Sequence, residues 1–204
     1  AYFSSFFVLL PAILVIMLIT NEYNYRTHKQ NIIDGWSRKD FMASKLIDVA
    51  IISFVVMTVY MLVALGFGVY ADPENMGRIA EQLHYIPMFY LQTFAQLTVA
   101  FLLGYLVKKA FIALGIFLFY YLVVENILVA YLKYKKIAIT RFLPIEVSDN
   151  ILVAPAFSGN FGKDAKEGYE LALTLVGEQV VLTCVYTLII WLICFKVHSK
   201  RDLA

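Results

Sequence analysis

Residues 21–45 read NEYNYRTHKQNIIDGWSRKDFMASK, and an apolar run flanks this stretch on each side. The stretch is rich in charge, with five basic and three acidic side chains: Arg26, Lys29, Arg38, Lys39 and Lys45, and Glu22, Asp34 and Asp40. The whole chain of 204 residues is 61% hydrophobic and only 16% charged, whereas a soluble domain has about 25% charged residues. This composition indicates a membrane protein whose few charges gather in the links between spans.

The two flanking runs belong to a series of five. Each is close to the roughly 20 residues that a helix needs to cross a bilayer, and each is too long and too uniformly apolar for a barrel strand. We therefore predict an all-α, polytopic integral membrane protein that forms a single transmembrane domain over residues 1–204. The predicted spans are residues 2–20, 46–70, 86–107, 110–132 and 177–197.

The charges of the links predict an orientation. Basic side chains dominate residues 21–45, the Lys108-Lys109 turn and the tail beyond 197, which the positive-inside rule assigns to the cytoplasm. The links 71–85 and 133–176 are then external, although the second opens with three lysines. This orientation makes the C-terminus cytoplasmic. A sixth span upstream would place both ends inside, and we expect a bacterial inner (cytoplasmic) membrane.

The 21–45 stretch has the signals of a folded element. Gly35 suits the left-handed position after a helix end, and Ser37 with Asp40 fits a capping box before the second span. Ile32, Ile33 and Trp36 form a small apolar patch at helical spacing. We predict a cytoplasmic helix that ends near Asp34, which either docks on a protein or lies on lipid as an interfacial helix.

Further along, the sequence predicts contacts near the membrane surface and short structure in the last link. Asp48 lies one turn beyond Lys45, and we expect the two to pair. The external link 133–176 is too long to lack structure. Short external helices are therefore predicted before the last span, with residues 164–175 running into it.

No pattern for catalysis, metal binding or nucleotide binding is found. The sequence lacks H-E-x-x-H, G-x-S-x-G and any Cys/His cluster with metal spacing. SGNFGKDA, at 158–165, fails as a P-loop, because it lacks the first glycine and the Ser or Thr after the lysine. The small net charge of +2 gives no reason to expect nucleic acid.

Three polar residues in or beside the spans are candidates for a translocation path, because intramembrane charge is often functional. They are Glu125 and Asn126 in the fourth span and Glu178 at the outer end of the fifth. The alternative for Glu125 is a structural role, paired with Asn126 or with a neighbouring helix.

The stretch YNYRTHKQNIIDGWSRKDFMASKLI resembles the inner loop of type-2 ABC exporter permeases. The matching positions are Glu22, Arg26-Thr27, Gln30-Asn31, Gly35, Ser37-Arg38 and Lys45. The C-terminal FKVHSKRDLA resembles the ending of the same family, and the long link before the last span also fits. The family has six spans where five are predicted here.

The resemblance implies that residues 21–45 form a coupling helix seated on an ATP-binding subunit. The implied contact residues are Arg26, Thr27, Lys29, Asn31, Ile32, Ile33, Gly35, Trp36, Ser37 and Arg38. The chain would bind no cofactor and have no enzymatic site, while ATP and Mg would lie on two partner ATPase subunits. A second permease copy or paralogue would complete the path. The alternative is a non-transporting membrane anchor, or an assembly or signalling partner, that docks a soluble protein through the same loop.

Overall fold

A computed structural model describes residues 2–71, 83–135, 142–153 and 163–200. Over these ranges the chain is helical and has no strand. Five helical segments are long and apolar enough to cross a membrane, namely Phe7–Asn24, Arg38–Tyr70, Tyr85–Val107, Ala110–Tyr134 and Glu170–His198. The predicted all-α membrane fold is confirmed, since long apolar helices satisfy their own backbone hydrogen bonds in lipid.

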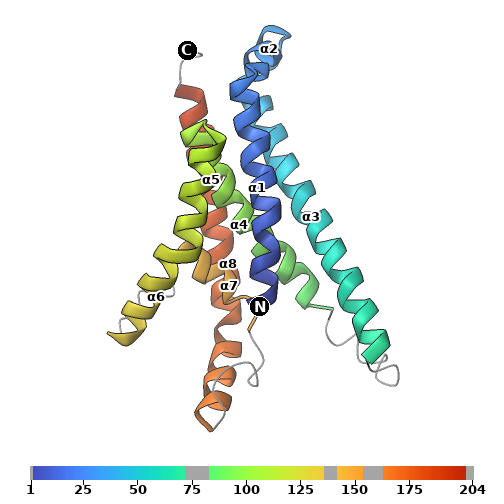
Figure 1. The fold of residues 1–204 in the computed structure, drawn as a ribbon, viewed down its shortest axis with the longest axis vertical. Coiled ribbons are helices and arrows are strands. Elements are labelled where there is room, and N and C mark those ends of the chain that lie inside the picture. Colours follow the sequence, from blue (N-terminus) through green and yellow to red (C-terminus); the bar gives the residue numbers. More distant parts are fainter. Residues whose placement is uncertain (1, 72–82, 136–141, 154–162, 201–204) are drawn as a thin grey trace.

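The helices follow one another up and down the long axis of the molecule (Figure 1). At one end, α2 (Thr27–Ile33) joins α1 (Tyr2–Asn24) to α3 (Arg38–Ala71). A two-residue turn joins α4 (Tyr85–Val107) to α5 (Ala110–Phe119), and a π-helix, η2 (Tyr120–Val124), continues α5 into α6 (Glu125–Tyr134). A six-residue helix, α7 (Pro144–Asp149), precedes α8 (Lys163–Lys200).

Two helices are much longer than the spans predicted for them. α3 begins at Arg38, eight residues before the predicted span, and α8 begins at Lys163, fourteen residues before its predicted span. Hydropathy marks the part of a helix that lies in lipid, whereas the helix itself begins at its cap. The predicted helix over 164–175 is confirmed as the first part of α8. α7 is a short helix within the link 133–176, of which residues 136–141 and 154–162 lie outside the described residues.

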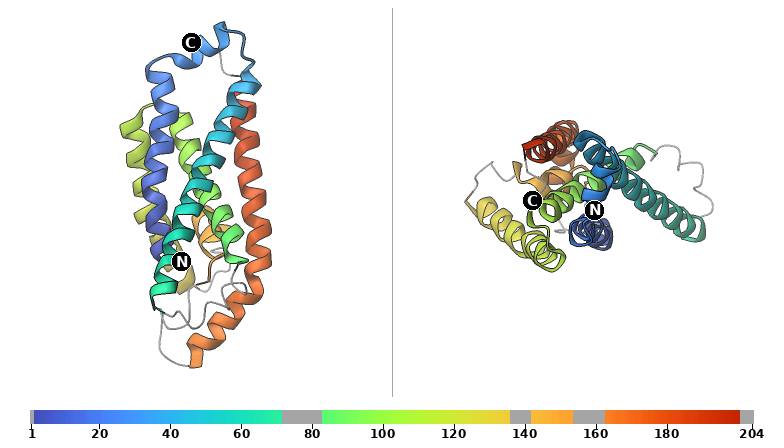
Figure 2. Two further views of the ribbon diagram at one scale, coloured as in Figure 1. Left: turned by 90° about the vertical axis from the view of Figure 1, so that its right-hand side faces the viewer. Right: turned by 90° about the horizontal axis from the view of Figure 1, so that it is seen from above.

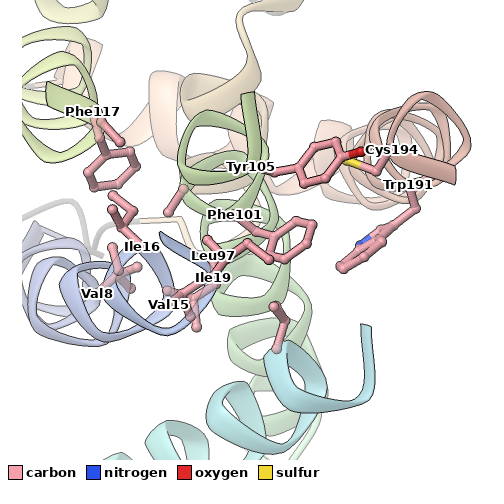
Figure 3. Close-up of a cluster of buried hydrophobic side chains, with 14 of the residues drawn as sticks. Val8, Val15, Ile16, Ile19, Leu97, Phe101, Tyr105, Phe117, Trp191 and Cys194 are labelled. Atoms are coloured by element: carbon pink, nitrogen blue, oxygen red, sulfur yellow. The ribbon is translucent and has the colours of Figure 1, made fainter. Parts of the chain in front are cut away.

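α4 is the central helix of the bundle. Half of its apolar span is buried, against 11% for that of α3, and it packs against α1, α3 and α8. Leu97, Phe101 and Tyr105 on α4 meet buried side chains of α1 and α8, and the Phe101 ring stacks on Trp191 with centroids 4.9 Å apart (Figure 3). Away from this core, α3 and α6 diverge to opposite sides at the end far from α2 (Figures 1 and 2).

Glycine permits the close approach of α1 to α4. A Cβ atom added at Gly104 would lie 2.7 Å from Ile19 Cγ2 and 3.4 Å from Ile16 Cα. Small residues at such crossings let transmembrane helices pack backbone against backbone. Gly104 therefore fixes the approach of the central helix to α1.

Candidate docking site

The sequence signals at the end of α2 fold as predicted. Gly35 has φ 101°, a value that glycine adopts at little cost. The Gly35 N–H donates to Ile32 O at 3.1 Å, and the Trp36 N–H donates to Asn31 O at 3.0 Å. This pair of hydrogen bonds is a Schellman motif, in which the orphan carbonyls at a helix end find donors. Trp36 therefore lies beyond α2, after the turn, and not on its helical face as the spacing had predicted.

The next helix begins at once with the predicted capping box. The Ser37 N–H donates to Asp40 Oδ2, and the Asp40 N–H donates to Ser37 Oγ, each at 3.1 Å. These bonds satisfy two of the donors that the start of α3 leaves free. A helix stop and a helix start thus follow each other within a few residues, which sharply defines the path of the loop.

The beginning of α2 is held against the end of α1. Arg26 adopts the left-handed conformation with φ 57°, a region uncommon for residues other than glycine. The His28 Nδ1 atom lies 3.0 Å from Glu22 O, and its ring packs on Tyr23 with centroids 4.5 Å apart. Thr27 Oγ1 donates to the same Glu22 carbonyl oxygen at 3.4 Å. α2 is therefore attached to α1 by more than its chain connection.

A buried lysine joins the two helices that flank the loop. Lys45 Nζ on α3 lies 2.5 Å from Glu22 Oε1 on α1 and 2.8 Å from Asp48 Oδ2, and only 9% of its side chain is exposed. The predicted Lys45–Asp48 pair is confirmed. The pairing with Glu22 was missed, because 23 residues separate the partners and no local pattern connects them. We call these three residues the lysine latch.

Aromatic side chains gather beside the lysine latch, at the end of the bundle where α1, α4 and α8 end and α3 begins. Lys108 Nζ lies 4.7 Å from the centroid of the Tyr23 ring. Tyr105 and His198 approach within 3.2 Å through Oη and Nδ1, and the His198 ring stacks on Phe41. The tight Lys108-Lys109 turn, with Lys108 at φ 58°, joins α4 and α5 into a helical hairpin.

The ten residues proposed for protein contact occupy one continuous loop at the tip of the bundle. Ile33 is 83% exposed and Trp36 is 46% exposed. Arg26, Thr27, Gly35 and Ser37 are also exposed, whereas Lys29, Asn31, Ile32 and Arg38 are half-buried. Two exposed apolar side chains, Ile33 and Trp36, thus stand among basic ones on a loop with defined caps.

The three path candidates are not brought together in this way. Glu125 is buried, with 3% exposure, and accepts the backbone N–H groups of Ile145 and Glu146, each at 2.8 Å. Asn126 is exposed and donates to Tyr121 O and Leu122 O within its own helix segment. Glu178 is exposed on α8. Glu125 therefore caps the start of α7. This contact agrees with the structural role that the sequence left open as the alternative to a translocation path.

Glu125 is one of several polar side chains that hold α7, a feature the sequence analysis missed. Gln92 and Gln96 of α4 donate to Asp149 Oδ1 at 2.7 and 2.6 Å. Three further contacts hold α7 and the residues just before it. Gln96 forms a hydrogen bond with Ser148, Lys133 forms an ion pair with Glu146, and the Tyr186 hydroxyl donates to Phe142 O. α7 is thus fixed at both ends by α4, α6 and α8. The π-helix directly before Glu125 was also missed, although such segments often lie at functional sites.

Within the described part of the chain, no group of three or more His, Cys, Asp or Glu residues could hold a metal ion. Most of the rejected P-loop pattern at 158–165 falls outside the described residues. No curated protein and no solved structure matches the chain. A family model described as "Protein of unknown function (DUF2705)" matches residues 1–204, and the chain therefore belongs to the DUF2705 family.

Proposed function

We propose that this protein is the membrane permease subunit of an ATP-driven ABC exporter, and that α2 docks on a separate ATP-binding subunit. The observation that carries the proposal is the loop from Arg26 to Arg38, where two adjacent caps hold Ile33 and Trp36 exposed at the tip of the bundle. A disordered link could not transmit a displacement, whereas a capped helix can move as a rigid body. The resemblance of the same residues to a coupling helix agrees with this role.

The lysine latch supports a mechanical role for the loop. Glu22 lies in the last turn of α1 and Lys45 lies about two turns into α3, so their contact closes the loop at its base. A push on α2 would then move both spans together, because the ion pair and the caps resist local bending. In the exporter, two ATP-binding subunits carry ATP and Mg, and a second permease copy or paralogue completes the path between the two membrane domains.

The distribution of charge supports an orientation with α2 in the cytoplasm. Described basic side chains collect at the end that bears α2, namely Arg26, Lys29, Arg38, Lys39, Lys45, Lys108, Lys109 and Lys196. At the opposite end, Lys133 and Lys135 close α6, and α8 begins with Lys163 and Lys166 in its sequence. The positive-inside rule places the richer end in the cytoplasm, where ATP-binding subunits reside. In this orientation the C-terminus is also cytoplasmic and the membrane is a bacterial inner membrane.

Site-specific crosslinking tests the proposal. A photo-crosslinking amino acid at Ile33 is expected to capture an ABC ATPase in cells, and the captured protein is identified by mass spectrometry. Leu62, an apolar residue in the middle of α3 that is 61% exposed, is the matched control and should capture no such protein. Co-purification in mild detergent should return the same ATPase with ATP-hydrolysing activity.

The outcomes separate the proposal from its competitors. A captured protein without an ATP-binding cassette would favour the non-transporting anchor or assembly partner. Equal, protein-free labelling at Ile33 and Leu62 would show that α2 rests on lipid, and the docking role would be lost.

A further inference from the structure

A groove runs between α3 and α4 in the half of the bundle away from the docking loop, and we call it the α3–α4 groove. Its volume is about 380 Å³, which is within the range of pockets that hold small ligands. It lies where α3 diverges from the bundle (Figures 1 and 2). The side chains that line it are apolar or aromatic, and they include Met57, Tyr60, Met61 and Ala64 of α3 and Ile86 and Phe89 of α4.

One helical stripe of α3 forms a wall of the groove. Its members recur at the i, i+4, i+7 and i+8 spacing that places side chains on one face of a helix, and they are Met57, Met61, Ala64 and Leu65. Two of these are methionines one turn apart, whose flexible side chains adapt to irregular apolar shapes. The wall therefore suits an apolar ligand without a rigid form of its own.

The groove runs from one membrane surface into the hydrocarbon. The Tyr60 ring stacks on Phe89 with centroids 4.3 Å apart, and α3 and α4 run in opposite directions (Figure 1), so Ala64 lies level with Tyr85 at the start of α4. Ala64 is nineteen residues beyond Lys45 of the lysine latch, or about 28 Å along the helix. This distance is close to the roughly 30 Å thickness of the hydrocarbon core. The other lining residues of α3 reach about 10 Å deeper.

Aromatic rings mark the surface end of the groove. Tyr85 lines this end, and its ring lies with its centroid 4.2 Å from that of His84. Tyrosine gathers at the level of the lipid headgroups in membrane proteins. Ala64 lines the same end and is exposed, as are its apolar neighbours Leu62 and Val63. The mouth of the groove is therefore continuous with the open apolar face of α3, which meets lipid.

Size and depth select the occupant of the groove. Water needs polar partners to fill a cavity, and apolar side chains at this depth offer few. A helix of a second copy is too wide to enter, because a helix of about 10 Å diameter fills roughly 900 Å³ over the 12 Å or so that the groove follows along α3. An acyl chain is narrow, flexible and apolar. At about 30 Å³ for a group of the size of water, such as a methylene, the groove has room for about a dozen of them.

We propose that the α3–α4 groove binds one acyl chain of a membrane phospholipid, from the leaflet on the side away from α2. The headgroup lies at the level of His84 and Tyr85, and the chain runs inward past Phe89 toward Met57. Bulk lipid is as apolar as the groove, so burial alone gives no preference. The enclosed chain gains instead from dispersion contacts on several sides, and it is retained longer than the lipid around the bundle. The site is independent of the proposed export function.

Quenching of tryptophan fluorescence by brominated lipid tests the site. The purified full chain with Phe89→Trp is placed in phosphatidylcholine nanodiscs, in which a growing fraction of the lipid carries bromine at the middle of its acyl chains. The signal of the parent chain, with Trp36 and Trp191, is subtracted. Because one site holds one chain, the fluorescence should fall in proportion to the mole fraction of brominated lipid. Leu62→Trp, on the open face of α3, is the matched reporter and should fall more steeply, because several chains surround it.

A pair of variants at neighbouring positions blocks the groove or spares it. Ala64→Phe puts a ring into the groove, whereas Val63→Phe adds the same ring on the open face of α3. Ala64→Phe should remove most of the quenching of Phe89→Trp, and Val63→Phe should leave it unchanged. Native mass spectrometry should find one retained phospholipid on the wild-type chain and on Val63→Phe, and none on Ala64→Phe.

Three results would overturn the proposal. A Phe89→Trp reporter that brominated lipid does not quench would show that protein covers the groove. A quenching curve as steep as that of Leu62→Trp would reduce the occupant to ordinary boundary lipid, and so would equal lipid retention by Ala64→Phe and Val63→Phe. The mass spectrometric comparison does not use the reporter, so it decides the question should Phe89→Trp fail to fold.

Discussion

The two ends of the bundle use polar residues in opposite ways. At the end that bears α2, caps and an ion pair hold a helix out from the spans, and apolar side chains face outward. In the half that holds α7, polar side chains of α4 and α6 form hydrogen bonds with this short helix and hold it in the bundle. An outward apolar surface meets lipid or a partner protein, whereas an inward polar network stabilises the chain itself. The difference agrees with the proposal that α2 meets a partner protein, and it makes α7 part of the scaffold.

The comparison predicts that the largest loss of stability comes from Glu125. Glu125→Ala leaves the buried N–H groups of Ile145 and Glu146 without an acceptor, at a cost of about 1–3 kcal/mol for each buried group. We expect the free energy of unfolding in detergent to fall by about 3 kcal/mol. Glu125→Gln keeps an acceptor oxygen and should lose less than half as much.

The same pair of variants separates scaffold from path in a transport assay once a substrate is known. A capping role predicts that Glu125→Gln retains transport, because its amide oxygen still accepts from α7. Loss of transport in a stable Glu125→Gln protein would instead make the charge itself functional, and would return Glu125 to the translocation path.

The second prediction concerns the lysine latch. Lys45→Met removes the cation between Glu22 and Asp48 while preserving the length of the side chain. Breaking a fully buried pair from one side costs about 3–5 kcal/mol. Here the Glu22 and Asp48 side chains are 20% and 36% exposed, so water replaces part of the loss and we expect about 2 kcal/mol.

A double-mutant cycle tests the latch as a contact between helices. Glu22→Gln and Lys45→Met should be less than additive, with a coupling of about 1 kcal/mol. Additive losses would mean that the pair does not join α1 to α3. Lys108→Met, at the same end but stacked on Tyr23, serves as the control for loss of a basic side chain.

How far the sequence could predict each end follows from the separation of the contacts. The caps around Gly35 and Ser37 join residues three to five positions apart, so a local pattern contains the whole signal. Glu125 meets Ile145 across 20 residues, and Gln92 meets Asp149 across 57. No periodicity or motif links such positions, and the sequence could therefore name Glu125 as unusual without finding what it binds.

The boundaries of the membrane helices were also only partly predictable from the sequence. Apolar composition predicted five membrane helices, which the structure confirms, because lipid admits few alternatives to a helix. It did not predict that α3 and α8 extend well beyond the apolar runs, or that η2 interrupts the fourth span. Where a long helix begins in water depends on caps and neighbours, and hydropathy does not register either of them.

The third prediction is a smaller effect at the loop itself. Ser37→Ala removes the side-chain half of the capping box and should destabilise the protein by about 1 kcal/mol, the usual cost of an N-cap. Thr58→Ala is the control, since its exposed hydroxyl bonds only within α3. Amide hydrogen exchange should speed up in the first turn of α3 in Ser37→Ala alone. Unchanged exchange there would show that Asp40 and the Schellman motif suffice to define the loop.

The smallest effect on stability should accompany the largest effect on docking. Trp36→Asp changes a side chain that is 46% exposed and lies after the Schellman turn, so the free energy of unfolding should change by less than about 0.5 kcal/mol. Aromatic residues at the centre of an interface often contribute more than 2 kcal/mol to binding, and a buried carboxylate in that place would add a desolvation cost. We therefore expect the proposed ATP-binding subunit to be lost from the purified protein while the fold is intact.

Phe67→Asp is the control for this change. It alters an exposed apolar position on α3 far from the loop, and it would perturb insertion in lipid but not the docking surface. If Trp36→Asp kept its partner, the contact would have to lie outside the loop, and the contrast between an outward docking end and an inward scaffold end would no longer hold.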